Sequence, residues 1–157
     1  MDTKTHKEEF EQTCSVFIDT VNNYFTHLTK NPSETGVPYL KEQDAVPLKD
    51  FTGMIGISGS RKGFVYISGN KGLYTELINE FIGIDDPTNE DVLDMAGELS
   101  NVVVGNLRET YGSDFMISVP IVFEGRPEKL KFPAGVSVYV IPIDWNSHQA
   151  NVVVGLA

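Results

Sequence analysis

The chain has 157 residues, 41% of them hydrophobic, so it can fill the core of one folded domain and is not intrinsically disordered. Its 22 acidic residues outnumber its 12 basic ones, and the resulting net charge of −10 repels nucleic-acid phosphates and anionic membranes. We therefore expect no nucleic acid and no membrane among its partners, which are instead proteins with a basic group or small ligands.

The sequence also limits compartment and metal chemistry. Cys14 is the single cysteine and cannot form an internal disulfide, and the three histidines are scattered without metal-ligand spacing. No apolar run approaches the roughly 20 residues of a membrane helix, and the polar N-terminus is unlike a signal peptide. These features predict a cytoplasmic protein with no metal site and no cofactor of its own.

The first half of the chain predicts a long helix, a β-hairpin and a short helix. Between residues 6 and 29, apolar residues recur every three to four positions, which is the period of an amphipathic helix. After a loop with an edge strand around Tyr39–Gln43, the period changes to two at Phe51, and residues 58–62 form a hairpin turn. Residues 73–83 predict a short helix that ends at Gly83.

The second half predicts one long helix followed by strands. Thr88 or Asn89 can cap a helix that runs to about Tyr111. Three strand-like segments follow, at residues 115–123, 136–143 and 151–156. This order of elements is typical of the α+β class with a mostly antiparallel sheet.

The helix that begins at Thr88 is apolar around most of its circumference. At about 100° per residue, its apolar residues leave one narrow polar stripe. The stripe consists of Asp94, Glu98, Asn101, Gly105 and Arg108. The first three follow the i, i+4, i+7 spacing and stack on successive turns.

Two interpretations of this polar stripe are open. A charged stripe is commonly no more than a solvated helix face. The alternative is an interface, in which Glu98 binds a lysine or arginine and the Asn101 amide binds a water in the partner's site. Catalysis by a nucleophile is disfavoured because neither residue has a base beside it. A glycosidase pair is disfavoured because Asp94 and Glu98 are neighbours on one helix.

Two glycines lie inside the predicted helix, Gly97 beside the polar stripe and Gly105 within it. Each costs about 1 kcal/mol there relative to alanine, so their presence calls for a packing reason. Another element of the same domain can cross at these positions, or a partner surface can approach closely.

The segment from Asp94 to Asn101 resembles the motif of the CheC/CheX/FliY family of chemotaxis phosphatases. That motif is an acidic or Ser residue, three residues, Glu, two residues and Asn on a long helix. The preceding hairpin, the short helix and the final strands extend the resemblance over nearly the whole chain, most closely to CheX. It implies a single CheX-like phosphatase domain over residues 1–157, of the α+β class, with a mostly antiparallel sheet packed against long helices. A second Glu-x-x-Asn, at Glu76 and Asn79, lacks the preceding acidic or Ser residue and is interpreted as a surface coincidence.

The resemblance implies a phosphatase that hydrolyses the aspartyl phosphate of a CheY-like response regulator. Asn101 would orient the attacking water, and Glu98 would pair with the regulator's active-site lysine. The residues expected to contact the regulator around this pair are Asp94, Gly97, Gly105 and Arg108. The regulator would supply the Mg²⁺. Two alternatives are a docking or scaffold module that does not hydrolyse the phosphate, and a structural domain related to the flagellar switch proteins.

The resemblance also implies a homodimer, because CheX-like members join or exchange strands. Residues 151–157 are an apolar strand without a charge, which would be an aggregation hazard as an unpaired edge. Burial of this strand inside its own domain is the alternative.

Overall fold

The computed structural model describes residues 3–41, 47–127 and 137–156. Within these ranges the chain forms the helices α1 (Thr3–Thr29), α2 (Lys71–Ile82), α3 (Asn89–Gly105) and α4 (Leu107–Tyr111). Its strands are β1 (Glu34–Thr35), β2 (Tyr39–Lys41), β3 (Phe51–Gly59), β4 (Gly63–Gly69), β5 (Phe115–Ile117), β6 (Ile121–Glu124), β7 (Ser137–Trp145) and β8 (His148–Leu156).

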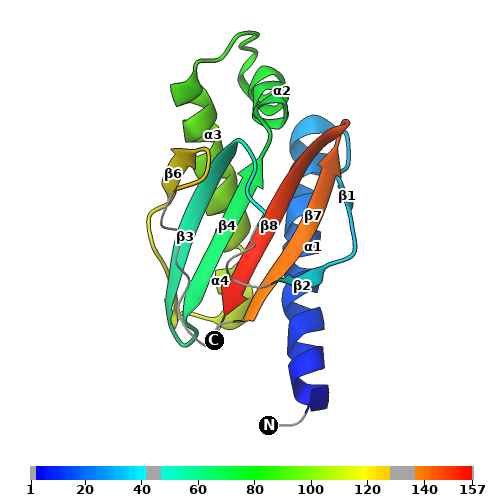
Figure 1. The fold of residues 1–157 in the computed structure, drawn as a ribbon, viewed down its shortest axis with the longest axis vertical. Helices are drawn as coiled ribbons and strands as arrows, with labels where there is room; N and C mark the ends of the chain where they lie inside the picture. Colours follow the sequence, from blue (N-terminus) through cyan, green and yellow to red (C-terminus); the bar gives the residue numbers. More distant parts are fainter. Residues whose placement is uncertain (1–2, 42–46, 128–136, 157) are drawn as a thin grey trace.

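The eight strands form one sheet with the order β1-β7-β8-β4-β3-β5, in which β2 also pairs with β7 and β6 with β3. Every pairing among the described strands is antiparallel. Helices α1 and α3 lie behind the sheet in Figure 1, on one of its faces, and α2 lies at the upper end of the molecule. The predicted α+β class with a mostly antiparallel sheet is therefore confirmed.

The core lies between this helical layer and the sheet. Strand β4 contributes side chains to both faces of the sheet, because successive side chains of a strand point in opposite directions. Val65 and Ile67 belong to the main core with the helices, whereas Phe64 and Tyr66 join a smaller buried cluster with residues of β7 and β8.

The first half of the chain agrees with the expected elements where the structure describes it; residues 42–43 of the expected edge strand lie outside the described residues. Helix α1 buries Phe17, Val21 and Phe25 on one face, and β3 and β4 form the hairpin. Helix α2 ends at Gly83, whose φ of 81° is left-handed and whose N–H donates to Asn79 O over 2.8 Å. Glycine adopts this conformation without a steric penalty, which explains why α2 ends there.

The expected helix from residue 88 to 111 is in fact two helices. Helix α3 ends at Gly105, and Asn106 separates it from α4. Gly105 and Asn106 are adjacent poor helix formers, so the helix breaks where two of them meet. Gly105 therefore lies at the end of α3, and its expected place inside the helix is wrong.

The strand predicted over residues 115–123 is also interrupted. Ile57 of β3 pairs with Ile117, and Met54 with Ile121, so three steps along β3 correspond to four along its neighbour. The extra residue is a β-bulge, fixed by a hydrogen bond of 2.8 Å from the Gly56 N–H to Ser118 Oγ.

Strand β8 is an interior strand. It pairs with β4 on one side and β7 on the other, and residues 150–156 are buried. Strand β8 is therefore buried inside its own domain, which is the alternative to an unpaired edge strand. Because it is paired on both sides, it gives no support to the prediction of a homodimer.

Candidate functional site

The start of α3 is fixed by a capping box. The Thr88 hydroxyl accepts a hydrogen bond of 3.1 Å from the Asp91 N–H, and Asp91 Oδ2 accepts one of 2.9 Å from the Thr88 N–H. Both backbone donors would otherwise lack a partner at a helix start. Thr88, one of the two expected caps, therefore defines where α3 begins.

The body of α3 lies unusually close to the sheet. A Cβ added to Gly53 of β3 would lie 2.7 Å from Ala96 O and would collide with Ser100 Oγ. Ser100 itself is 1% exposed and donates to Ala96 O over 2.8 Å, which satisfies its buried hydroxyl. Small residues on both elements let the helix backbone approach the strand, so the position of α3 is closely determined.

The polar stripe faces solvent, as its spacing predicts. Asp94, Glu98 and Asn101 are exposed, while Val92, Ala96, Leu99 and Val103 on the opposite side are at most 2% exposed. Neither Asp94 nor Asn101 makes a hydrogen bond or ion pair with any other residue that the structure describes. A rigid helix thus presents an acid and an amide that no described intramolecular partner satisfies.

The other expected interface residues differ in their surroundings. Gly97 is buried, and a Cβ there would lie 3.3 Å from Val122 Cγ1 of β6. Internal packing therefore accounts for this glycine. A Cβ at Gly105 would meet nothing within 4 Å, so no internal contact requires glycine there. Arg108 is exposed on α4, beyond the break at Asn106.

Tyr24 of α1 lies near Glu98, and the sequence interpretation did not include it. Its side chain is 9% exposed, and its hydroxyl donates to Met95 Sδ over 3.9 Å. Burial, and then the negative charge of Glu98, raise the pKa of Tyr24 to about 12. In the sequence, Tyr24 follows Phe17 by seven residues and so lies on the same buried face of the helix, which could have indicated its burial.

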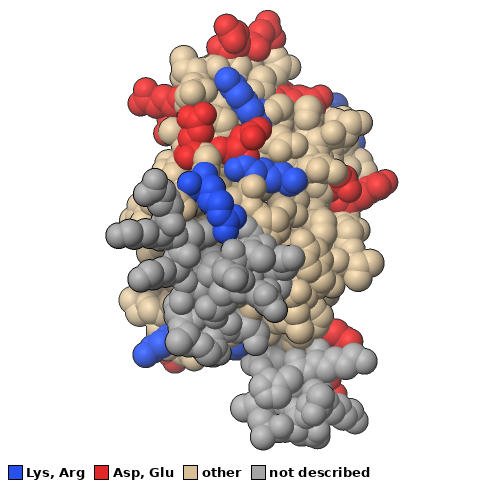
Figure 2. Space-filling model, viewed as in Figure 1, with Lys and Arg blue, Asp and Glu red and all other residues tan. Residues whose placement is uncertain are grey.

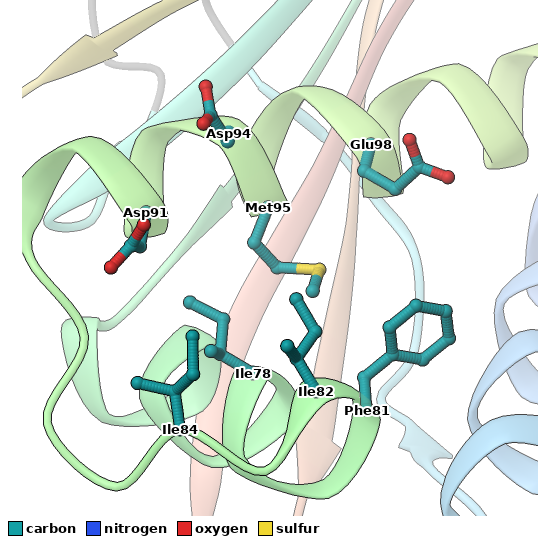
Figure 3. A pocket seen from close by; sticks show the side chains of 8 residues that line it. All are labelled: Ile78, Phe81, Ile82, Ile84, Asp91, Asp94, Met95 and Glu98. Carbon is teal, nitrogen blue, oxygen red and sulfur yellow. The ribbon is translucent and has the colours of Figure 1, made fainter.

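A groove between α2 and α3 adjoins the polar stripe, and it too was missed. We call it the α2–α3 groove; it has a volume of about 300 Å³. Its apolar lining is Ile78, Phe81 and Ile82 of α2, Ile84 of the following loop and Met95 of α3. The carboxylates of Asp91, Asp94 and Glu98 complete the lining. Figure 3 shows Met95 pointing from α3 toward the apolar side chains, with Glu98 and Phe81 at one end.

The second Glu-x-x-Asn pair is occupied by internal contacts. Glu76 Oε2 lies 2.7 Å from His148 Nε2 at the start of β8, and Asn79 Nδ2 donates to Asp85 Oδ1. These contacts tie α2 to the β7–β8 turn and to the loop before α3. Glu76 and Asn79 therefore have a structural role, and surface coincidence is an incomplete description.

Two further properties bear on the chemistry of the site. Among the described residues, no three His, Cys, Asp or Glu side chains gather in a way that could hold a metal ion. Within the same ranges, no helix combines the length and apolarity needed to span a membrane.

The chain was compared with protein-family models, curated protein sequences and solved structures. The family model described as chemotaxis phosphatase CheX matches residues 51–144, which include all of α3. No curated protein sequence matches the chain.

Several solved structures share the fold. CheX from Vibrio vulnificus has 24% sequence identity and a TM-score of 0.78, with 90% of this chain and 97% of that chain covered. CheX from Desulfovibrio desulfuricans has 21% identity and a TM-score of 0.80, with 93% and 99% covered. The CheX–CheY–BeF₃–Mg²⁺ complex from Borrelia burgdorferi has 19% identity and a TM-score of 0.72, with 91% and 96% covered.

Proposed function

Because the chain belongs to the CheX family of chemotaxis phosphatases, we propose that it hydrolyses the aspartyl phosphate of a CheY-like response regulator. The observation that carries this proposal is the exposed pair Glu98 and Asn101, one turn apart on a helix whose opposite face is buried. The Borrelia burgdorferi structure, in which CheX is complexed with CheY, BeF₃ and Mg²⁺, supports a regulator as the partner.

In the proposed reaction, a water molecule attacks phosphorus in line with the aspartyl oxygen. The P–O bond to the carboxylate breaks, the regulator's aspartate leaves as a carboxylate, and inorganic phosphate is released. Such a reaction depends mainly on positioning and on stabilisation of charge. The Asn101 amide can accept from the water through its oxygen and donate through its nitrogen, so it would hold the water in the attacking position.

Glu98 would fix the register of docking. It lies three residues before Asn101, about 4.5 Å away along the helix axis, so an ion pair at Glu98 places Asn101 one turn further into the regulator's site. A regulator lysine is a suitable partner, because a charge-assisted hydrogen bond to a carboxylate is stronger than a neutral one.

The packing of α3 supports this use of two exposed side chains. The capping box fixes its first turn, and the close contact of Gly53 with Ala96 fixes its middle. A rigid support is needed, since misplacing a catalytic group by about 1 Å can cost about 10²-fold in rate.

The remaining proposals concern the surroundings of this pair. Asp94 and Arg108 would make contacts with the regulator at either end of the stripe. The open surface at Gly105 would let the regulator approach closely, whereas Gly97 would contribute through its packing against β6. The regulator would supply the Mg²⁺. A homodimer stays a prediction from the family resemblance, which a monomer in light scattering at micromolar concentration would contradict.

The test is release of phosphate from a panel of phosphorylated CheY-like regulators, with and without the protein. Glu98→Ala should weaken binding, slow turnover and reduce the salt dependence of binding, because one partner of an intermolecular ion pair is lost. Glu11→Ala removes the same charge from an exposed site on α1 and should change none of these. If the protein accelerated phosphate release from none of the regulators in the panel, that result would contradict the proposal.

A further inference from the structure

The α2–α3 groove is lined by large apolar side chains that are exposed to solvent. Phe81 is 52% exposed, Ile82 60% and Ile84 39%, although all three adjoin one another around the end of α2. Contiguous exposed apolar residues with a polar rim mark an interaction site more often than scattered ones do. The groove volume of about 300 Å³ leaves room for a side chain of a partner.

The charges around the groove indicate what kind of side chain approaches it. The lining that the structure describes contains three carboxylates and no lysine, arginine or histidine. Asp91 is partly satisfied by the Thr88 N–H, but Asp94 has no hydrogen bond or ion pair to a described residue. Figure 2 shows further Asp and Glu side chains at the upper end of the molecule, where Figure 1 places α2 and the start of α3, with Lys and Arg side chains among and below them. A fitting partner therefore presents an apolar side chain next to a lysine or arginine.

The groove is continuous with the site proposed above. Asp94 and Glu98 belong both to the polar stripe and to the groove lining. From Glu98 the lining continues to Asp91, seven residues earlier and about 10 Å along the helix axis. A regulator whose lysine pairs with Glu98 must cover this neighbouring surface as well.

We propose that the α2–α3 groove is a second docking surface for the response regulator, which inserts an apolar side chain flanked by a basic residue beside Phe81. This proposal rests on the proposed function, because it takes the regulator as the partner. The groove sets affinity and choice of regulator, whereas Asn101 sets the rate. A second copy of this chain is a poorer occupant, because a symmetric contact would bring the same carboxylates face to face.

The test separates affinity from turnover. We would measure binding to a CheY-like regulator loaded with BeF₃⁻ and Mg²⁺, and separately kcat and KM for phosphate release. Phe81→Ser should weaken binding and raise KM by about 10-fold or more, as expected for an aromatic residue central to an interface. It should leave kcat within about twofold, because the contact is the same in the ground state and the transition state.

Controls are available in the same chain. Leu40→Ser removes a comparable apolar side chain, 65% exposed on β2, and should leave affinity unchanged. Ile82→Ser provides a second groove variant if Phe81→Ser lowers the thermal midpoint.

The possible failures can be distinguished. Wild-type affinity for both groove variants would overturn the docking surface, and unchanged phosphate release would leave the proposed function intact. Loss of a dimer with wild-type regulator affinity would also overturn it, in favour of a second copy. If wild type bound the regulator without releasing phosphate, the proposed function would fail, while weaker binding by Phe81→Ser would still support the groove.

Discussion

Replacing Gly53 by alanine tests how closely α3 is held against the sheet. The new Cβ would lie 2.7 Å from Ala96 O, and ordinary contact begins at 3.4 Å. Ser100 can turn its hydroxyl away, but the Ala96 carbonyl belongs to the helix backbone, so α3 itself has to move. Overpacking of this kind costs about 1–3 kcal/mol, and the lower conformational entropy of an unfolded alanine offsets about 0.5–1 kcal/mol.

We therefore expect Gly53→Ala to lower the free energy of unfolding by about 1–2 kcal/mol, which is about 2–8 °C in Tm. Urea unfolding, followed by the fluorescence of the single buried Trp145, measures this change. Since α3 carries Glu98 and Asn101, kcat for phosphate release should fall on the order of 10-fold. Gly105→Ala is the stability control, because a Cβ there meets nothing within 4 Å. A Gly53→Ala variant as stable as wild type would refute the close approach of helix and strand.

Two other predictions concern the capping box and the buried thiol. Thr88→Ala should lower stability by about 1 kcal/mol in urea unfolding, whereas Thr88→Ser keeps the hydroxyl and should be nearly neutral; equal losses would exclude the cap as the cause. Burial raises the pKa of Cys14 from 9.0 to about 11, so iodoacetamide at pH 8 should label it only after unfolding. Between pH 9 and 11 the unfolded chain loses the thiol proton of Cys14, whereas the folded chain keeps it. The thiol therefore lowers the free energy of unfolding as the pH rises, and Cys14→Ala should lessen that fall.

The sequence predicts the orientation of α3 because helical periodicity reports which side chains face a core. The apolar face and the exposed Asp94, Glu98 and Asn101 follow from that period alone. Gly97 illustrates the limit, because its packing depends on Val122, 25 residues further along. The period places glycine beside the stripe but does not identify the element that crosses it.

What the sequence could not predict depends on contacts between distant segments. Strand β8 is apolar whether it lies at an edge or inside the sheet, and only its pairing with both β4 and β7 distinguishes the two. Phe81 and Ile82 are apolar residues of α2, and only the folded structure shows that they are exposed. Tyr24 contacts Met95, and the charge of Glu98 acts on it, only after α1 packs beside α3.

The most direct test of the proposed phosphatase activity is Asn101→Ala, assayed for phosphate release and for binding to the BeF₃⁻-loaded regulator. The side chain is exposed and makes no bond to a described residue, so the fold should be unchanged. We predict a fall in kcat of about 100-fold or more, as for removal of one well-placed polar group from a transition state, with affinity nearly unchanged. Wild-type turnover by Asn101→Ala would contradict the proposed role of this amide and favour a docking module that does not hydrolyse the phosphate.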